Sequence, residues 1–129
     1  MIIHKIKVAH QDERGAISDI LQQVVVDCVT LITITNGSIR GNHYHKDSIQ
    51  YSYVLSGEVI AYSQMPNQKV EKSILKAGDM LESPAMERHS IHGIDDNSVL
   101  LILTKGPRGG GRYEEDTFRV SPLHETIDP

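Results

Sequence analysis

The sequence predicts an all-β domain, a small sandwich or barrel built from about eight to ten short strands. Polar and apolar residues alternate with a period of two in most segments, and no longer window keeps the 3.6-residue period of an amphipathic helix. Glycine, asparagine, aspartate and proline interrupt these segments at close spacing, as turns between short strands require. The chain has 129 residues, which is the length of one domain.

The first half of the chain contains four candidate strands, and turn residues separate them. They cover residues 16–22, 28–35, 49–55 and 58–64. The segment 28–35 is the clearest of the four because it is rich in β-branched residues. In the segment 49–55, strict alternation places Tyr51 and Tyr53 on one face of the strand, together with Ile49 and Leu55.

The second half continues this pattern up to Thr104. Its candidate strands cover residues 69–76, 80–83, 87–94 and 98–104. We expect the last two to pair with each other across the turn 95–97. Beyond Thr104 the sequence becomes rich in glycine and polar residues. We therefore expect a single domain over 1–129, with a core at about 16–104 and a flexible loop and loosely held C-terminal tail at 105–129.

Charge and cysteine content exclude several classes of protein. The formal net charge is 13 − 17 = −4, and a mildly acidic chain without a basic run is unsuited to nucleic acids or anionic membranes. Cys28 is the only cysteine, so an intrachain disulfide and a thiolate zinc site are both excluded. The apolar run at the N-terminus is too short, and the segment too charged, to be the hydrophobic region of a signal peptide. We expect a cytoplasmic protein.

Histidines are the residues most suited to chemistry here. The chain has seven, and His43 and His45 lie two residues apart. On a strand, two residues at this spacing point to the same face. Two imidazoles on one face can hold one metal ion or flank one substrate.

The histidine pair belongs to a wider pattern of spaced residues. In order, these are Gly37, His43-Tyr44-His45, Gln50 and Gly57, followed by Gly78, Pro84 and His89. The pattern resembles the two motifs of the cupin superfamily over about residues 30–104. The first cupin motif contains a glycine, an H-x-H pair, a glutamate and a closing glycine, and the second contains a glycine, a proline, a further glycine and a histidine. The resemblance implies a double-stranded β-helix, or jelly-roll barrel, with its site inside the mouth.

The resemblance also implies a metal site, although this sequence departs from the family pattern. Gln50 stands at the usual glutamate, and Met86 stands at the second glycine. His43, His45, Gln50 and His89 would form a site of three nitrogens and one oxygen, suited to Zn, Ni, Fe or Mn. An amide oxygen is a weaker ligand than a carboxylate, so we expect weaker affinity for metal than a glutamate would give. No organic cofactor is expected.

A narrower resemblance concerns the segment around the histidine pair. Arg40-Gly41-Asn42-His43-Tyr44-His45-Lys46 with Gln50 is similar to cupin enzymes that act on nucleotide-linked 4-keto-6-deoxy sugars. The 3,4-ketoisomerases of that group carry an Arg-Gly, an H-x-H-Lys and a glutamine at this spacing. The resemblance implies that a histidine removes the proton beside a keto group and that Arg40 contacts the phosphates. The substrate would then be a sugar or nucleotide sugar used for surface polysaccharide.

Two interpretations use the same histidines. If metal binds His43 and His45, neither is the base, because a coordinated lone pair cannot accept a proton, and the metal would polarise the keto oxygen. Without metal, His43 or His45 is the catalytic base. No acid is assigned, and Tyr113 stands without the C-terminal signature of the 3,5-epimerases.

Residues outside the motifs supply further candidates. Tyr53 and Tyr62 are candidates for stacking a base or sugar, while Arg108 and Arg112 flank a triple glycine and are candidates for contacting an anion. The alternatives to a sugar isomerase or epimerase are a metal-dependent dioxygenase and a non-catalytic small-molecule-binding protein. We also expect a homodimer, because the edge strands of an open jelly roll are best covered by pairing.

Overall fold

The computed structural model describes residues 1–126, apart from the side chain of Tyr113. Within this range the chain forms strands and two short 3₁₀ helices. The elements in chain order are β1 (Ile2–Lys5), β2 (His10–Asp12), β3 (Gly15–Ile17), β4 (Cys28–Ile34), β5 (Ile39–Tyr44), β6 (Ile49–Ser56), β7 (Glu58–Gln64), β8 (Glu71–Lys76), β9 (Asp79–Ser83), β10 (Arg88–Gly93), β11 (Ser98–Lys105), η1 (Gly109–Asp116), β12 (Phe118–Arg119) and η2 (Leu123–Thr126). The all-β prediction is confirmed. Among the described residues, no helix has the length and apolar character needed to cross a membrane.

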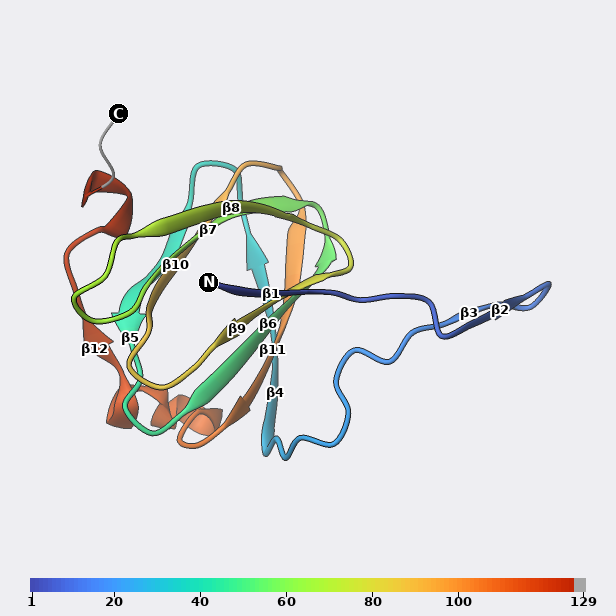
Figure 1. Ribbon diagram of the computed structural model, residues 1–129, viewed down its shortest axis with the longest axis horizontal. Helices are drawn as coiled ribbons and strands as arrows, with labels where there is room; N and C mark the ends of the chain where they lie inside the picture. Colours follow the sequence, from blue (N-terminus) through green and yellow to red (C-terminus); the bar gives the residue numbers. More distant parts are fainter. Residues whose placement is uncertain (127–129) are drawn as a thin grey trace.

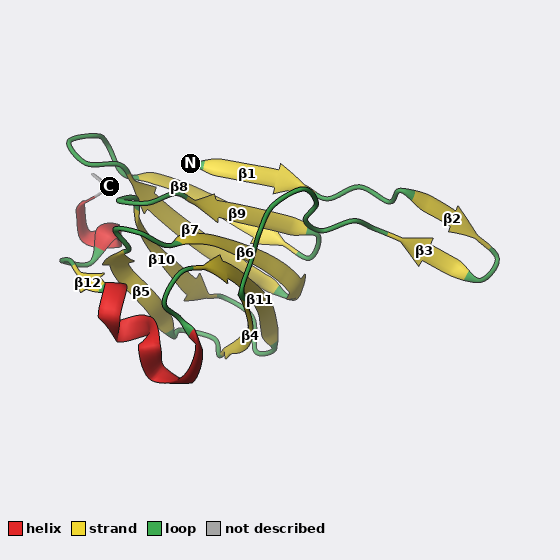
Figure 2. Cartoon of the chain, turned by 90° about the horizontal axis from the view of Figure 1, so that it is seen from below, coloured by secondary structure: helices red, strands yellow, loops and turns green. Residues whose placement is uncertain are grey.

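The strands form two five-stranded antiparallel sheets that face each other (Figure 1). One sheet has the order β1-β9-β6-β11-β4 and the other has the order β12-β5-β10-β7-β8. The strands β2 and β3 pair only with each other, and the hairpin that they form projects well away from the barrel (Figures 1 and 2). The strand expected at 16–22 is much shorter in the structure, because β3 ends at Ile17.

The expected pairing of 87–94 with 98–104 is wrong. β10 pairs with β5 and β7, whereas β11 pairs with β4 and β6 in the opposite sheet. The connection at 95–97 therefore crosses from one sheet to the other. Both strands bury apolar side chains in the same core from opposite sides, because Ile91 and Leu100 both belong to it. A short polar link between two apolar segments is equally compatible with a hairpin and with such a crossing.

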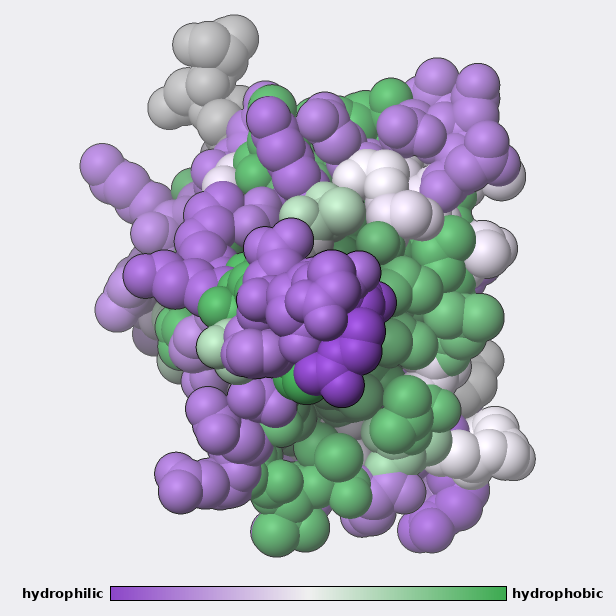
Figure 3. Space-filling view, turned by 90° about the vertical axis from the view of Figure 1, so that its right-hand side faces the viewer, coloured by the Kyte–Doolittle hydropathy of each residue, from purple (hydrophilic) through white to green (hydrophobic). Residues whose placement is uncertain are grey.

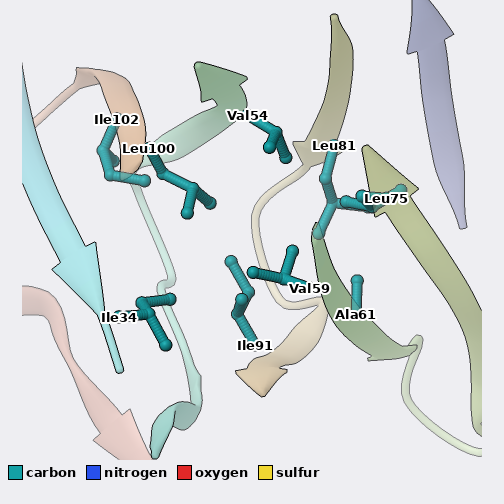
Figure 4. Close-up of a cluster of buried hydrophobic side chains, with 9 residues drawn as sticks. All are labelled: Ile34, Val54, Val59, Ala61, Leu75, Leu81, Ile91, Leu100 and Ile102. Carbon is teal, nitrogen blue, oxygen red and sulfur yellow. The ribbon is translucent and has the colours of Figure 1, made fainter. Parts of the chain in front are cut away.

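The hydrophobic core lies between the two sheets (Figure 4). Alternation sets its composition: in β11, Leu100 and Ile102 are buried, while Leu101 between them is only partly covered. The core residues are Ile34, Val54, Val59, Ala61, Leu75, Leu81, Ile91, Leu100 and Ile102. Burial of this apolar surface is the main source of stability for the barrel.

The segment after Thr104 is more ordered than the sequence predicted. η1 follows β11, β12 adds an edge strand to β5, and Leu123 in η2 is only 2% exposed. The three glycines 109–111 are part of η1 and do not form a free loop. Gly110 and Gly111 adopt the left-handed conformation there, which glycine accepts without strain. The last part of the expected tail, 127–129, lies outside the described residues.

Candidate functional site

Three histidines from the two cupin-like motifs meet inside the barrel. His43 lies on β5, His45 follows directly after it, and His89 lies on β10 opposite His43 in the strand register. The ring centroids are 4.9 Å apart for His43 and His45, 4.7 Å for His43 and His89, and 5.3 Å for His45 and His89. One nitrogen from each ring lies within 4.8 Å of the others. The structure therefore brings together the three side chains that the sequence singled out.

The local backbone of β5 makes this approach possible. Gly41 has a φ of +100°, and a Cβ at this position would lie 2.7 Å from the carbonyl oxygen of His89. Only glycine lets the two strands approach so closely. The neighbouring Asn42 also has a positive φ, and the register of β5 against β10 shifts between His89 and Ser90. This irregularity accounts for the glycine and asparagine that precede His43.

The ring orientations leave two nitrogens free to bind a ligand. Nδ1 of His45 lies 2.8 Å from the backbone carbonyl of Asp116, and Nδ1 of His89 lies 3.4 Å from that of Glu87. A carbonyl only accepts, so each Nδ1 donates its proton and each Nε2 keeps its lone pair. Both Nε2 atoms are buried without a hydrogen-bond partner in the described structure. Buried polar atoms without partners point to a bound ion, ligand or water.

Gln50 lies at the same site. It is on β6, only 5% exposed, and its Nε2 donates to Ser52 Oγ at 3.1 Å. Its Oε1 is buried and has no partner among the described atoms. Three imidazoles and this oxygen form a donor set that fits a borderline transition metal. The residues present therefore fit the metal site implied by the sequence.

Burial dominates the electrostatics of the histidines. It lowers the pKa of His43 to about 4, and the neighbouring His45 together with Arg119 and Arg108 contributes in the same direction. Burial, with smaller effects of His43 and His45, also places the pKa of His89 well below its ordinary value. Both rings are therefore neutral at pH 7, which is the form that binds metal.

A cavity of about 580 Å³ opens onto this cluster. His43, His89 and Gln50 line it, together with three arginines. These arginines are Arg40, Arg108 and Arg119. Guanidinium groups hold planar anions such as phosphate by paired hydrogen bonds. The cavity thus combines imidazoles with cationic groups.

The arginines come from separate parts of the chain. Arg40 lies on β5, and its Nε donates to the carbonyl of Thr33 at 3.3 Å. Arg119 lies on β12 and forms a bidentate pair with Glu114, at 2.8 and 3.0 Å. Arg108 precedes η1 and lines the cavity as expected, whereas Arg112 pairs with Glu115 and is absent from the lining.

The two tyrosines singled out for stacking do not line this cavity. Tyr53 lies on the face of β6 opposite that of Gln50 and Val54, because residues alternate along the strand. Tyr62 is opposite Ser90 in the register and contacts the rings of His92 and His124. Both tyrosines therefore lie on outer faces of the barrel.

Sequence reasoning missed two residues of the site, Asp116 and Arg119. Both come from the segment expected to be a loose tail, where no periodicity or motif marks them. Burial alone raises the pKa of the Asp116 carboxyl, but N–H groups of Lys46, Asp47 and Ser48 outweigh it and hold the pKa below its ordinary value. Only the folded chain shows these contacts.

The fold and the site together define the class of protein: a small cupin barrel with a three-histidine cavity. Residues 10–107 match the family described as the polysaccharide biosynthesis C-terminal domain. The chain belongs to this family. An oxalate decarboxylase from Arthroderma benhamiae is 29% identical over 98 residues, which cover 75% of this chain and 22% of the relative. The chain thus spans less than a quarter of the curated relatives that it matches.

Solved structures show the same fold at low sequence identity. The rmlC epimerase of Mycobacterium tuberculosis superposes with a TM-score of 0.77 at 15% identity, covering 92% of this chain and 67% of that one. A variant of a 3,4-ketoisomerase from Thermoanaerobacterium thermosaccharolyticum, bound to TDP-4-keto-6-deoxyglucose, has a TM-score of 0.72 at 21% identity, covering 97% and 92%. These likenesses confirm the cupin jelly roll expected from the sequence.

Proposed function

We propose that the protein is an isomerase or epimerase that acts on a nucleotide-linked keto sugar in polysaccharide biosynthesis. The family to which it belongs supports this proposal, as do the epimerase and the 3,4-ketoisomerase that share the fold. The observation that carries it is the cavity itself. Three imidazoles lie beside a space lined by Arg40, Arg108 and Arg119. A keto sugar would lie near the imidazoles while its diphosphate contacts the arginines.

The reaction needs a weakly acidic C–H beside a carbonyl to lose its proton. The proton returns to a different carbon in an isomerase, or to the opposite face of the same carbon in an epimerase, and no electrons are gained or lost overall. A base removes the proton, and a positive or hydrogen-bonding group stabilises the enolate oxygen. His43 and His45 are the proposed catalytic groups. Arg40 is the proposed clamp on the phosphates.

We also propose that His43, His45, His89 and Gln50 hold a divalent transition metal, namely Zn, Ni, Fe or Mn. A bound metal would polarise the keto oxygen as a Lewis acid. The pKa of about 4 for His43 supports the role of ligand, because such an imidazole is neutral at pH 7 but a weak base. If His43 is instead the base, activity persists after complete removal of metal.

Proton exchange with solvent tests the proposed reaction. The purified protein is incubated with TDP-4-keto-6-deoxyglucose in D₂O, and NMR follows deuterium entering the carbon beside the keto group. We expect incorporation by the wild type and a loss of at least about 100-fold in His45→Asn, the scale on which a positioned acid or base contributes. His92→Asn is the matched control, because His92 lies on the same strand as His89 but on its other face.

The contrary outcomes of that experiment are distinct. No incorporation across several nucleotide-linked keto sugars contradicts the isomerase or epimerase. Turnover of oxalate instead would favour the chemistry named for the curated relative. Binding of a nucleotide sugar without exchange would favour the non-catalytic alternative.

Elemental analysis tests the metal. The protein is purified without chelator, and the metal content is measured for the wild type, His89→Asn and His92→Asn. We expect one transition metal ion per chain in the wild type and in His92→Asn, and loss of it in His89→Asn. A folded wild type that takes up no metal when Zn²⁺, Ni²⁺, Fe²⁺ or Mn²⁺ is added contradicts the metal site.

We further propose that two copies of the chain form a homodimer through the sheet that contains β6, β11 and β4. Its outer face is apolar and exposed, with Val29 62% and Leu31 61% exposed. Figure 3 shows a broad hydrophobic area on the side from which the β2–β3 hairpin projects. An isolated two-stranded hairpin is marginally stable, so a second copy that covers it and the apolar face would stabilise both.

Light scattering after size-exclusion chromatography tests the homodimer. We expect a mass of about twice 14.4 kDa for the wild type. Leu31→Asp should give a monomer, since it places a charge in the proposed interface. Ile74→Asp is a matched control, because Ile74 is 51% exposed on the other sheet. A monomeric wild type at high concentration contradicts the proposal.

A further inference from the structure

Asp116 forms the densest set of hydrogen bonds around the histidine cluster. It ends η1 and is only 4% exposed. Its carboxylate accepts hydrogen bonds from the backbone N–H groups of Lys46 at 2.8 Å, Asp47 at 3.0 Å and Ser48 at 2.9 Å. A single side chain thus holds the whole backbone turn that follows His45.

The same residue also contacts the ring of His45. Its backbone carbonyl oxygen lies 2.8 Å from Nδ1 of His45. Because this oxygen can only accept, the proton of the neutral ring is on Nδ1 and the lone pair is on Nε2. That Nε2 atom is buried and has no hydrogen-bond partner in the described structure.

We propose that Asp116 is the positioning residue of the site. The carboxylate of Asp116 fixes the turn 46–48, and this turn holds the ring of His45 against the backbone carbonyl of Asp116. The ring is thereby held in one tautomer with its Nε2 lone pair available to the site. The role of that lone pair, as a metal ligand or a proton acceptor, rests on the proposed function. The hydrogen bonds of Asp116 are present in the structure without bound metal or substrate.

Two features separate this role from ordinary turn capping. The carboxylate reaches residues about seventy positions away in sequence, so it joins the C-terminal segment to the site rather than closing a local turn. The segment that begins with Arg108 and ends with Asp116 also contributes a wall of the cavity. Groups that orient a metal-binding imidazole typically change metal affinity about 10–100-fold when they are removed.

The tautomer of His45 is the first test, and it needs neither metal nor substrate. Long-range ¹H–¹⁵N NMR of the metal-free wild type distinguishes a ring protonated on Nδ1 from one protonated on Nε2. We expect a single Nδ1–H tautomer for His45 at pH 7. A ring protonated on Nε2, or an equal mixture, overturns the proposal whether or not the protein proves to be an isomerase.

Substitution of Asp116 is the second test. Asp116→Ala keeps the backbone carbonyl but removes the carboxylate, so it isolates the effect of the turn on His45. Co²⁺ serves as the probe metal, because its visible spectrum reports on its ligands. We expect a mixture of His45 tautomers, a loss of Co²⁺ affinity of about 10–100-fold and an altered spectrum of the bound Co²⁺. Asp116→Asn keeps one acceptor oxygen and should lose less than Asp116→Ala.

Asp79→Ala provides a matched control. Asp79 is also a buried carboxylate, 6% exposed, which accepts a backbone N–H from Lys76 at 2.9 Å in a turn outside the cavity lining. We expect Asp79→Ala to lower the melting temperature without changing the His45 tautomer or the Co²⁺ spectrum. If both alanine variants change the site equally, or if Asp116→Ala leaves it unchanged, Asp116 has only a structural role. If Asp116→Ala does not fold, the wild-type tautomer and Asp116→Asn decide.

Discussion

The interior of the barrel has two ends that differ in chemistry although the same strands build them. One end holds the hydrophobic core around Val54, Ile91 and Leu100. The other end holds the histidine cluster. Along β6 the inward residues change from Val54 to Gln50, and along β10 they change from Ile91 to His89. One alternation rule thus places both sets inside, and residue type alone separates a core from a site.

The two ends contribute oppositely to stability. The apolar end buries its side chains completely, with Leu100 0% exposed. The histidine end buries polar atoms that lack hydrogen-bond partners among the described residues, including Nε2 of His89 and Oε1 of Gln50. Each such atom costs about 1–3 kcal/mol unless a ligand or water satisfies it. The apolar end therefore stabilises a site that is formed in advance of its ligand.

The largest expected effect comes from the apolar end. Leu100→Ala leaves a cavity between the sheets and should lower the free energy of unfolding by about 2–5 kcal/mol. Urea denaturation measures this change. If the ends are independent, the affinity of the folded variant for Co²⁺ stays unchanged. A parallel loss of affinity would show that the core also holds the histidines in place.

The converse experiment removes a group from the histidine end. His89→Ala should reduce Co²⁺ affinity by at least about 100-fold, which corresponds to about 2.7 kcal/mol. The free energy of unfolding of the metal-free protein should fall much less than in Leu100→Ala, because an unpartnered buried nitrogen is removed with the ring. Isothermal titration and urea denaturation give the two quantities. A larger loss of stability than Leu100→Ala causes would contradict this division of roles.

Gln50→Glu should have a smaller effect of opposite sign in the two measurements. A carboxylate is a stronger ligand than an amide, so Co²⁺ should bind about tenfold more tightly, or about 1.4 kcal/mol. The metal-free protein should become less stable, because a buried carboxylate without a partner is costly. Titration with Co²⁺ and denaturation without metal test both signs. Unchanged affinity would mean that residue 50 does not coordinate.

The smallest expected effect is a dependence of stability on pH. The pKa of His43 is about 4 in the folded protein, against an ordinary value of 6.5. Between these values the unfolded chain binds a proton that the folded chain does not, so stability is full above about pH 6.5 and falls towards pH 4. At pH 5.5 the loss should be about 1 kcal/mol for this histidine. Denaturation of the metal-free protein measures it, and His43→Asn should show a flatter dependence.

Many of the strands could be predicted because a β-strand shows a local alternation of polar and apolar residues. The segment 58–64 coincides with β7, and 28–35 differs from β4 only at its last residue. Pairing is a different matter, since strands join partners distant in sequence. The pairing of 87–94 with 98–104 was wrong for this reason, and β1 and β5 were not predicted as strands. Pairing with β9, β10 and β12 holds these two strands in place, and a local sequence pattern does not show which strands pair.

The candidate site divides in the same way. The spacing of His43, His45 and His89 predicted a shared cavity, and the structure brings their rings together. Tyr53 and Tyr62 were chosen for residue type alone, and the alternation of β6 and β7 directs them to outer faces. Once Gln50 and Val54 are known to point into the barrel, the alternation of β6 places Tyr53 on its outer face. Sequence offered no comparable signal for the contacts of Asp116.

The amino-acid order by itself determined the all-β class, the strands of the central segment and the candidate residues for binding metal or transferring a proton. These properties depend on side-chain type and on a repeat of two, which are local quantities. Only the tertiary structure decided which strands are neighbours, and that the C-terminal segment supplies Arg108, Asp116 and Arg119 to the site. Such contacts join residues many positions apart, and their energies depend on packing rather than on sequence spacing.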